Sequence, residues 1–298
     1  MRILIVGATG YLGSAVAERL SNLGHEVVAL VRPGETKSLD GYERRIGDLT
    51  DPGSLLPAVT PDIDAVIDVA TPSGDADTDA AAIDALTRRL RGTDRVFVYT
   101  SGVWVLGATA DGTADEHSAT DPIPIVGYRP MIEDQVLALA QAGIRSAVIR
   151  PGIIHGRGGG IPSLLVDLAR EHDAPLIIAD ESVHWPMVHI DDLADLFAEV
   201  VEHTPAATIW HGVTEPAVSV RDLAIAAGRA AGVTAAPRIW PLDQARAELG
   251  AAFADALALD QSVSARATRD LLSWQPQGPS AISDIQDGSY RSALHHES

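Results

Sequence analysis

Three glycines near the start of the chain, Gly7, Gly10 and Gly13, follow a short apolar run and precede a helical pattern. In a dinucleotide-binding turn the first glycine permits a tight bend, the second lets the backbone approach the phosphates, and the third lets the helix pack closely. Free N–H groups at the start of that helix then face the pyrophosphate. An ordinary strand–helix turn is the structural alternative. The residues predicted to hold a nicotinamide dinucleotide here are Gly7, Thr9, Gly10, Tyr11, Leu12 and Gly13.

Arg32 follows Gly13 by 19 positions, at the end of the second apolar run. An acidic residue at about this distance usually holds the ribose hydroxyls of NAD, whereas an arginine accommodates the 2′-phosphate of NADP. A guanidinium can pair with phosphate through two hydrogen bonds and can stack on adenine. The sequence therefore favours NADP as the cofactor, with NAD as the second choice. A solvated surface arginine is the alternative interpretation.

Short apolar segments alternate with helical patterns through the first half of the chain, and these elements must position the glycine turn. Strands are predicted at residues 3–6, 27–31, 42–46, 64–69, 95–99 and 147–149. Helices are predicted at residues 14–23, 52–58, 79–91 and 130–142. This alternation is typical of an α/β protein with a doubly wound parallel sheet and right-handed crossovers. Residues 1–155 are expected to form this dinucleotide-binding domain.

The pattern changes after about residue 155, where Gly156 and Gly158 begin a glycine-rich stretch. Helices are predicted near residues 162–171, 190–203, 219–231 and 245–258, and short strands near 176–179 and 208–211. Residues 156–298 are expected to form mainly a smaller C-terminal substrate lobe beside the carboxyl ends of the strands, with some segments returning to the sheet. The last residues, from His295 to Ser298, are expected to fray.

Composition narrows the classes of partner. The 298 residues include no cysteine and carry a formal net charge of −19. Without cysteine the chain has neither disulfides nor thiolate chemistry, which fits a reducing cytoplasm. The negative charge disfavours nucleic acid and anionic membrane surfaces, and no apolar run is long enough to span a bilayer. The histidines lack tight ligand spacing with carboxylates, so no metal site is predicted.

Further motifs extend over nearly the whole chain. They are Gly47-Asp48-Leu49-Thr50-Asp51, Asp68-Val69-Ala70-Thr71, Tyr99-Thr100-Ser101, the segment from Arg150 to Gly156, the segment from Val188 to Ala194, and Ser273-Trp274-Gln275-Pro276. Together with the glycine turn, they resemble the extended short-chain dehydrogenases/reductases, the family of nucleotide-sugar epimerases, dehydratases and related reductases. The resemblance implies a Rossmann fold, a small-molecule substrate, and a homodimer of the kind that many relatives form.

The same resemblance implies cofactor contacts after several of the strands. Asp48 and Leu49 should border the adenine, although Asp48 could instead cap the next helix. The segment from Pro151 to Ile154 should lie near the nicotinamide end. The cofactor residues implied beyond the glycine turn and Arg32 are Asp48, Leu49, Val69, Ala70, Thr71, Thr100, Pro151, Gly152 and Ile154.

The catalytic pattern of that family is incomplete in this chain. The family uses a tyrosine as general acid/base, a lysine four residues later whose cation lowers the tyrosine pKa, and an earlier serine that orients the substrate oxygen. Matching Tyr128 to the tyrosine puts Ile132 at the lysine position, whereas matching the following helix puts Pro130 there. The single lysine of the chain is Lys37, far away in sequence. The sequence therefore predicts a divergent branch that lacks the tyrosine–lysine pair.

Three residues are the candidates for catalysis. Tyr128 is a candidate proton donor, and a packing aromatic before Pro130 is the alternative. Ser101 is a candidate for orienting the substrate, although a second alignment puts Gly102 at that position. His155 takes a place where the family often has tyrosine, at the rim of the cofactor site, and histidine suits proton transfer near neutral pH. A partly buried structural histidine is its alternative.

The sequence thus predicts an NADP-dependent oxidoreductase of the short-chain type that reduces a small carbonyl, imine or sugar-like substrate with a non-standard proton donor. Two alternatives stay open. One is a dinucleotide-binding sensor or interaction protein that no longer catalyses, and the other is a non-redox cyclase or isomerase that reuses the pocket. The incomplete catalytic pattern motivates the first alternative, while a second lobe with room for substrate argues against it.

Overall fold

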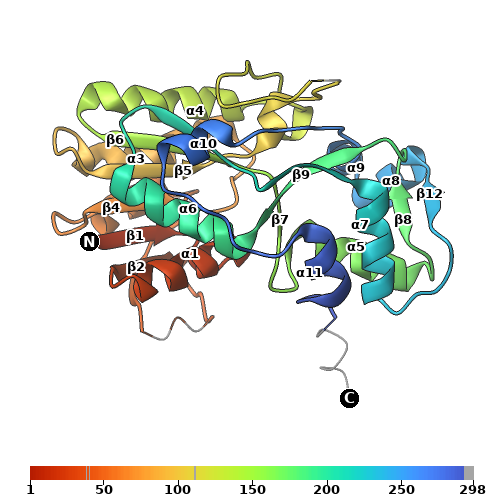
Figure 1. Cartoon of the computed structure of the whole chain (residues 1–298). Helices are drawn as coiled ribbons and strands as arrows, with labels where there is room; N and C mark the ends of the chain where they lie inside the picture. Colours follow the sequence, from red (N-terminus) through yellow and green to blue (C-terminus); the bar gives the residue numbers. More distant parts are fainter. Residues whose placement is uncertain (38, 40, 111, 292–298) are drawn as a thin grey trace.

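Seven parallel strands form the central sheet, in the order β10-β6-β5-β4-β1-β2-β3 (Figure 1). The computed structural model describes residues 1–37, 39, 41–110 and 112–291, so the predicted fraying of His295 to Ser298 lies outside the described residues. The aliphatic runs of the sequence become strands that are buried on both faces, as in parallel sheets generally, whereas the edge strand Glu43–Ile46 is mostly exposed. The strands are β1 (Arg2–Val6), β2 (Glu26–Val31), β3 (Glu43–Ile46), β4 (Ala65–Asp68), β5 (Val96–Thr100), β6 (Arg145–Pro151) and β10 (Thr208–Gly212).

Helices cover both faces of this sheet, which confirms the predicted doubly wound α/β fold. On one face α1 (Tyr11–Asn22) packs against α6 (Ile190–His203). The other face carries α2 (Pro52–Leu55), α3 (Ala76–Thr87) and α4 (Arg129–Ala138). Short 3₁₀ turns occupy Leu56–Ala58, Arg88–Leu90, Val103–Leu106, Pro124–Val126 and Leu139–Ala142.

A smaller lobe with its own apolar core stands beside the carboxyl ends of the strands (Figure 1). Two small sheets, ordered β11-β9-β7 and β12-β8, run through it. Their strands are β7 (Ile153–His155), β8 (Leu176–Ile178), β9 (His184–His189), β11 (Glu215–Ser219) and β12 (Arg238–Trp240). The later helices are α5 (Gly160–Glu171), α7 (Val220–Ala230), α8 (Leu242–Leu249), α9 (Ala251–Leu257), α10 (Arg266–Leu271) and α11 (Ala281–Asp287). No helix in the described ranges is long and apolar enough to cross a membrane.

Several elements of the C-terminal half differ from the prediction. Strands β7, β9, β11 and β12 and helices α10 and α11 were not predicted. Pro186 lies inside β9 and Pro216 inside β11, and a proline weakens the sequence signal of a strand. The predicted helix over residues 245–258 is two helices, which part at Gly250 with a φ of 84°. Strand β10 belongs to the central sheet, and helix α6 packs on that sheet. The chain therefore crosses between the lobes more than once.

Candidate functional site

The turn between β1 and α1 is closed so tightly that two of its glycines admit no side chain. Gly7 has a φ of +87°, and a Cβ there would lie 2.8 Å from the backbone of Ala70. A Cβ at Gly13 would lie 2.0 Å from the carbonyl oxygen of Gly7. Gly10 caps α1 without a side-chain hydrogen bond, so the first N–H groups of the helix stay free. This geometry suits the binding of a pyrophosphate against the helix N-terminus.

A groove of about 650 Å³ runs from this turn across the carboxyl ends of β1, β2 and β4. Gly13 does not line the groove, because it packs behind the turn against Gly7. The loop around Asp48 closes the far end, where the Asp48 carboxylate accepts the Thr50 N–H at 2.9 Å. The predicted cofactor residues that line it are Gly7, Thr9, Gly10, Tyr11, Leu12, Arg32, Asp48, Leu49, Val69, Ala70 and Thr71.

Two cations lie at this groove. Arg32 lines it, and within the described parts of the chain its guanidinium has no ion pair and no hydrogen bond. Lys37 donates from Nζ to the carbonyl oxygen of Thr9, in the glycine turn itself. No role of Lys37 at the groove is predicted from the sequence, in which its position five residues after Arg32 is the available signal. Both cations favour a ligand with several phosphates.

A second cavity, of about 520 Å³, adjoins the groove, and the two share Tyr11, Thr71 and Pro72 in their walls. Its walls are mostly apolar side chains and backbone, which suits a small organic molecule. The predicted residues that line it are Thr100, Ser101, Tyr128, Pro151, Gly152 and Ile154. The apolar side chains that surround them include Val103, Trp104, Ile125, Val126, Ile153 and Ile161.

Three hydroxyl groups at the end of β5 have no hydrogen-bond partner in the part of the chain that the structure describes. The side-chain oxygens of Tyr99, Thr100 and Ser101 are buried and form no hydrogen bond within the described residues. Thr100 and Ser101 line the cavity, and Ser101 is only 6% exposed. Buried hydroxyls are normally hydrogen-bonded, so a ligand oxygen is the natural partner for these two groups. This supports the predicted place of Ser101 beside a substrate.

Tyr128 lines the same cavity, but its phenol is engaged elsewhere. The hydroxyl donates to Asp79 at 2.7 Å, and the other oxygen of Asp79 accepts the Ser73 N–H at 3.0 Å. Burial, followed by the Asp79 carboxylate, raises the pKa of Tyr128 to about 12. The family needs the opposite shift, a phenol whose pKa is lowered by lysine. Tyr128 is therefore in the site, in an environment that holds its proton.

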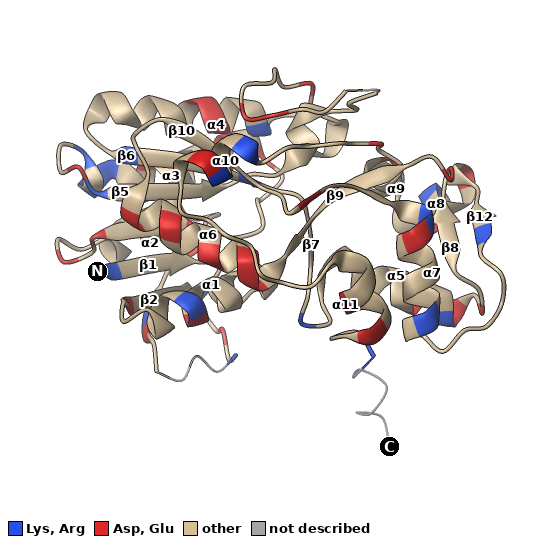
Figure 2. Ribbon diagram, viewed as in Figure 1, with Lys and Arg blue, Asp and Glu red and all other residues tan. Residues whose placement is uncertain are grey.

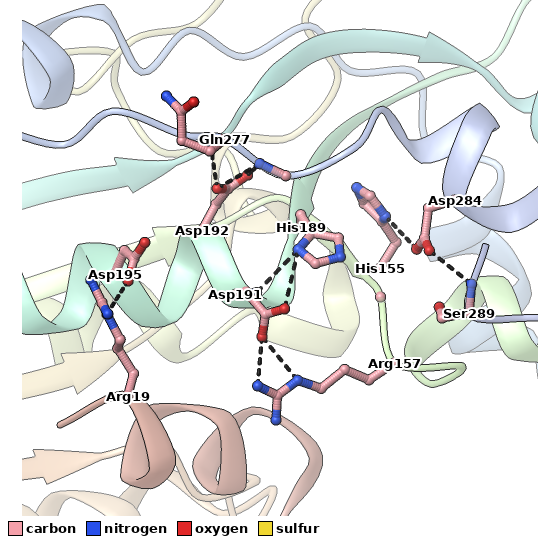
Figure 3. A network of polar contacts seen from close by, with 12 residues as sticks. Arg19, His155, Arg157, His189, Asp191, Asp192, Asp195, Gln277, Asp284 and Ser289 are labelled. Carbon is pink, nitrogen blue, oxygen red and sulfur yellow. Dashed lines mark hydrogen bonds and ion pairs between the residues drawn. The ribbon is translucent and has the colours of Figure 1, made fainter. Parts of the chain in front are cut away.

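His155 does not lie at the rim of the site, and that expectation is wrong. The side chain is completely buried in β7 and lines neither cavity. Its Nδ1 is 3.1 Å from Asp284 of α11, and its ring stands edge-on to that of His189 at 5.1 Å (Figure 3). The reason is topological, because β7 pairs with β9 on one side and α11 covers it. His155 is a structural histidine of the lobe junction.

His155, His189 and Asp284 also bring potential metal-ligand atoms within 4.8 Å of one another. Hydrogen bonds of the two histidine rings account for the short separations between these side chains. Nδ1 of His155 is engaged with Asp284, and Nδ1 of His189 accepts the Asp191 N–H at 3.3 Å (Figure 3). The cluster thus holds α11 and the start of α6 against β7.

The glycine-rich loop after β7 closes over the cofactor turn. The Tyr11 hydroxyl donates to the carbonyl of Gly156 at 2.7 Å, and the Gly156 N–H donates to the hydroxyl of Tyr290 at 2.8 Å. Tyr290 in turn donates to the carbonyl of Gly159 at 2.7 Å. A Cβ at Gly159 would lie 2.5 Å from the Tyr11 ring. Tyr290, which is not predicted as a site residue from the sequence, therefore links the end of the described chain to the dinucleotide turn.

These features define a Rossmann protein whose dinucleotide groove opens into a separate apolar cavity. Residues 3–210 match the family model described as NAD dependent epimerase/dehydratase family, and the chain belongs to this family. The predicted extended short-chain dehydrogenase/reductase relationship is confirmed. The family is NAD(P)-binding and includes oxidoreductases as well as epimerases.

Individual relatives are similar over most of their length. An uncharacterised protein of Schizosaccharomyces pombe is 30% identical over 302 residues, covering 97% of this chain and 100% of that protein. The 2'-dehydrokanamycin reductase of Streptomyces kanamyceticus is 27% identical, covering 82% of this chain and 72% of the enzyme. The human epimerase family protein SDR39U1, solved with NADPH, has a TM-score of 0.74 at 20% identity, covering 97% of this chain and 99% of that one. Other structures with this fold contain NAD.

Proposed function

We propose that the protein is an NADP-dependent reductase of a small, mainly apolar carbonyl or imine compound. The observation that carries the proposal is the continuous space from the groove at Arg32 to the free hydroxyls of Thr100 and Ser101. The apolar walls disfavour the sugar-like substrates that the sequence left open, because sugar hydroxyls need many hydrogen-bond partners. The reductase name of the Streptomyces kanamyceticus relative supports the same reaction type.

The residues fit a bound dinucleotide, and each has a task there. When bound, NADPH supplies a hydride. The turn at Gly7 and Gly10 holds the pyrophosphate, and the apolar walls exclude water and position the substrate. Ser101 donates a hydrogen bond to the substrate oxygen from its unpartnered hydroxyl. The proton that completes reduction does not come from a tyrosine–lysine pair, because the chain has only Lys37, which is bonded to Thr9.

Arg32→Gln is expected to weaken NADPH binding about 10–100-fold, the usual loss for hydrogen bonds to a charged group, and to leave NADH binding nearly unchanged. The 2′-phosphate is the group that distinguishes the two nucleotides, and Arg32 forms no ion pair with any carboxylate among the described residues. Fluorescence titration of the purified protein with each nucleotide measures both constants. The control is Arg238→Gln, on β12 in the other lobe. Equal weakening of both nucleotides contradicts the assignment, and the absence of binding by the unaltered protein contradicts the proposed function.

Tyr128→Phe is expected to keep kcat within about tenfold, whereas loss of a true general acid costs about 10²–10⁴-fold. The phenol already donates a hydrogen bond to Asp79 at 2.7 Å, and its pKa is raised to about 12, so it holds its proton. NADPH consumption with a carbonyl substrate found by screening measures the rate. Asp79→Asn is the matched variant, since it disturbs the same bond from the other side. A loss of more than 100-fold in Tyr128→Phe alone shows instead that the phenol is the required acid.

A dinucleotide-binding sensor is the second candidate function. The observation that favours it is the hydrogen bond from the Tyr128 phenol to Asp79 at 2.7 Å, with Ile132 rather than a lysine four residues later, because the site then lacks the family's acid–base pair. Tight NADPH binding, together with no turnover across a broad screen of carbonyls and imines, supports the sensor over the reductase.

A further inference from the structure

Arg129, the first residue of α4, is the only charged side chain that lines the apolar cavity within the described chain. Its guanidinium forms no ion pair and no hydrogen bond with any described residue. A Cβ placed on Gly102 would lie 3.9 Å from its Nη1, so the guanidinium reaches the loop that follows Ser101. The cation therefore stands near the two unpartnered hydroxyls of Thr100 and Ser101.

Many arginines of this chain form ion pairs with carboxylates, whereas Arg129 faces an apolar cavity without such a partner among the described residues. Asp and Glu outnumber Lys and Arg by 41 to 22, and Figure 2 shows acidic residues repeated along helices such as α6. On the same helix as Arg129, Glu133 pairs with Arg150. The positive charge of Arg129 opposes the rise in pKa that burial causes in Asp68 of β4, but the two side chains form no ion pair. A half-buried cation in apolar walls is costly without a partner, so a ligand anion is the partner that this cavity lacks.

We propose that Arg129 binds the carboxylate of an apolar organic anion in this cavity. The planar guanidinium matches a carboxylate through two parallel hydrogen bonds. Thr100 and Ser101 are then free for a second oxygen, and Trp104, Ile125 and Ile161 enclose an alkyl or aryl body. A monoanion is favoured over a phosphate dianion because Arg129 is the only cation among the described residues that line the cavity. The Asp68 carboxyl already interacts with the charge of Arg129, which leaves less positive charge for a dianion. The identity of the substrate rests on the proposed reductase function: a carbonyl compound that also carries a carboxylate is an apolar oxo acid.

The binding test needs neither cofactor nor turnover. Calorimetry compares octanoate with octanamide, a probe of similar size without the charge, on the full chain. The unaltered protein is expected to bind octanoate about 10–100-fold more tightly, as for charge-assisted hydrogen bonds generally. In Arg129→Gln the preference for octanoate should disappear while octanamide binding stays the same. Arg238→Gln, which removes an arginine outside the cavity walls, should leave both constants unchanged.

With octanoate and octanamide, three outcomes overturn the proposal: equal binding of the two probes, no binding of either, or an octanoate preference that survives Arg129→Gln. Octyl phosphate is the third probe, and its tighter binding would assign the cavity to phosphates and overturn the carboxylate. NADPH titration of the same samples reports separately on the dinucleotide site. If the unaltered protein binds no NADPH but still prefers octanoate to octanamide, the proposed reductase function is refuted and the anion site is retained.

Discussion

Replacing Gly13 with alanine is expected to weaken NADPH and NADH binding more than 100-fold, the largest effect of any single methyl group added to this site. The new Cβ would lie 2.0 Å from the Gly7 carbonyl oxygen and 3.0 Å from the Cα of Ala8. These are backbone atoms, so no rotamer relieves the overlap and α1 must move away from the turn. The N–H groups that face the pyrophosphate move with the helix. Overpacking of this kind also lowers the free energy of unfolding by about 1–3 kcal/mol.

Gly24→Ala is the matched control, because Gly24 follows the same helix at its other end. Its φ of +85° makes alanine strained by about 1–2 kcal/mol, yet no atom of the described residues lies within 4 Å of the added Cβ. Gly24→Ala should therefore lose stability and keep its affinity for nucleotide. Fluorescence titration gives the dissociation constants, and urea unfolding gives the stabilities of both variants. If Gly13→Ala binds NADPH as the unaltered protein does, the groove at this turn is not the dinucleotide site.

The importance of Gly13 follows from sequence spacing alone, and the reason is that the turn is local. Gly7, Gly10 and Gly13 lie within one strand–helix junction, so their order along the chain already determines which atoms meet. The same holds for the strands of the sheet, whose continuous apolar runs are the expected signal of buried parallel strands. The sequence therefore predicted the sheet, the groove and most of its lining.

The environment of the catalytic candidates could not be predicted in this way. Tyr128 meets Asp79 across 49 residues, and His155 meets Asp284 across 129. Neither separation leaves a periodic signal in the sequence, because such contacts depend on how the whole sheet and α11 come together. The residue types indicated that Tyr128 and His155 could transfer protons. Their partners in the structure show that the Tyr128 phenol is kept protonated beside a carboxylate and that the His155 imidazole is buried away from the cavity.

Glu133→Gln is expected to lower the free energy of unfolding by about 3–5 kcal/mol, because it leaves a buried guanidinium without its counter-charge. Glu133 of α4 and Arg150 of β6 have side chains only 3% exposed, and Nη2 of Arg150 lies 2.5 Å from the carboxylate. Nε of Arg150 donates to the same group at 3.1 Å. Urea unfolding followed by circular dichroism measures the change. Glu18→Gln is the control, since its ion pair with Arg157 is exposed and should contribute less than about 1 kcal/mol.

The pair also joins α4 to β6, and both elements contribute residues to the lining of the apolar cavity, so its loss should affect the site. Helix α4 carries Arg129, and Pro151, which directly follows Arg150 in β6, also lines the cavity. Replacing both partners, as Glu133→Met with Arg150→Met, removes the unpaired charge and should recover most of the stability. Octanoate binding should then recover as well, because α4 is again packed against β6. A double variant as unstable as Glu133→Gln alone would show that packing, not the buried charge, accounts for the loss.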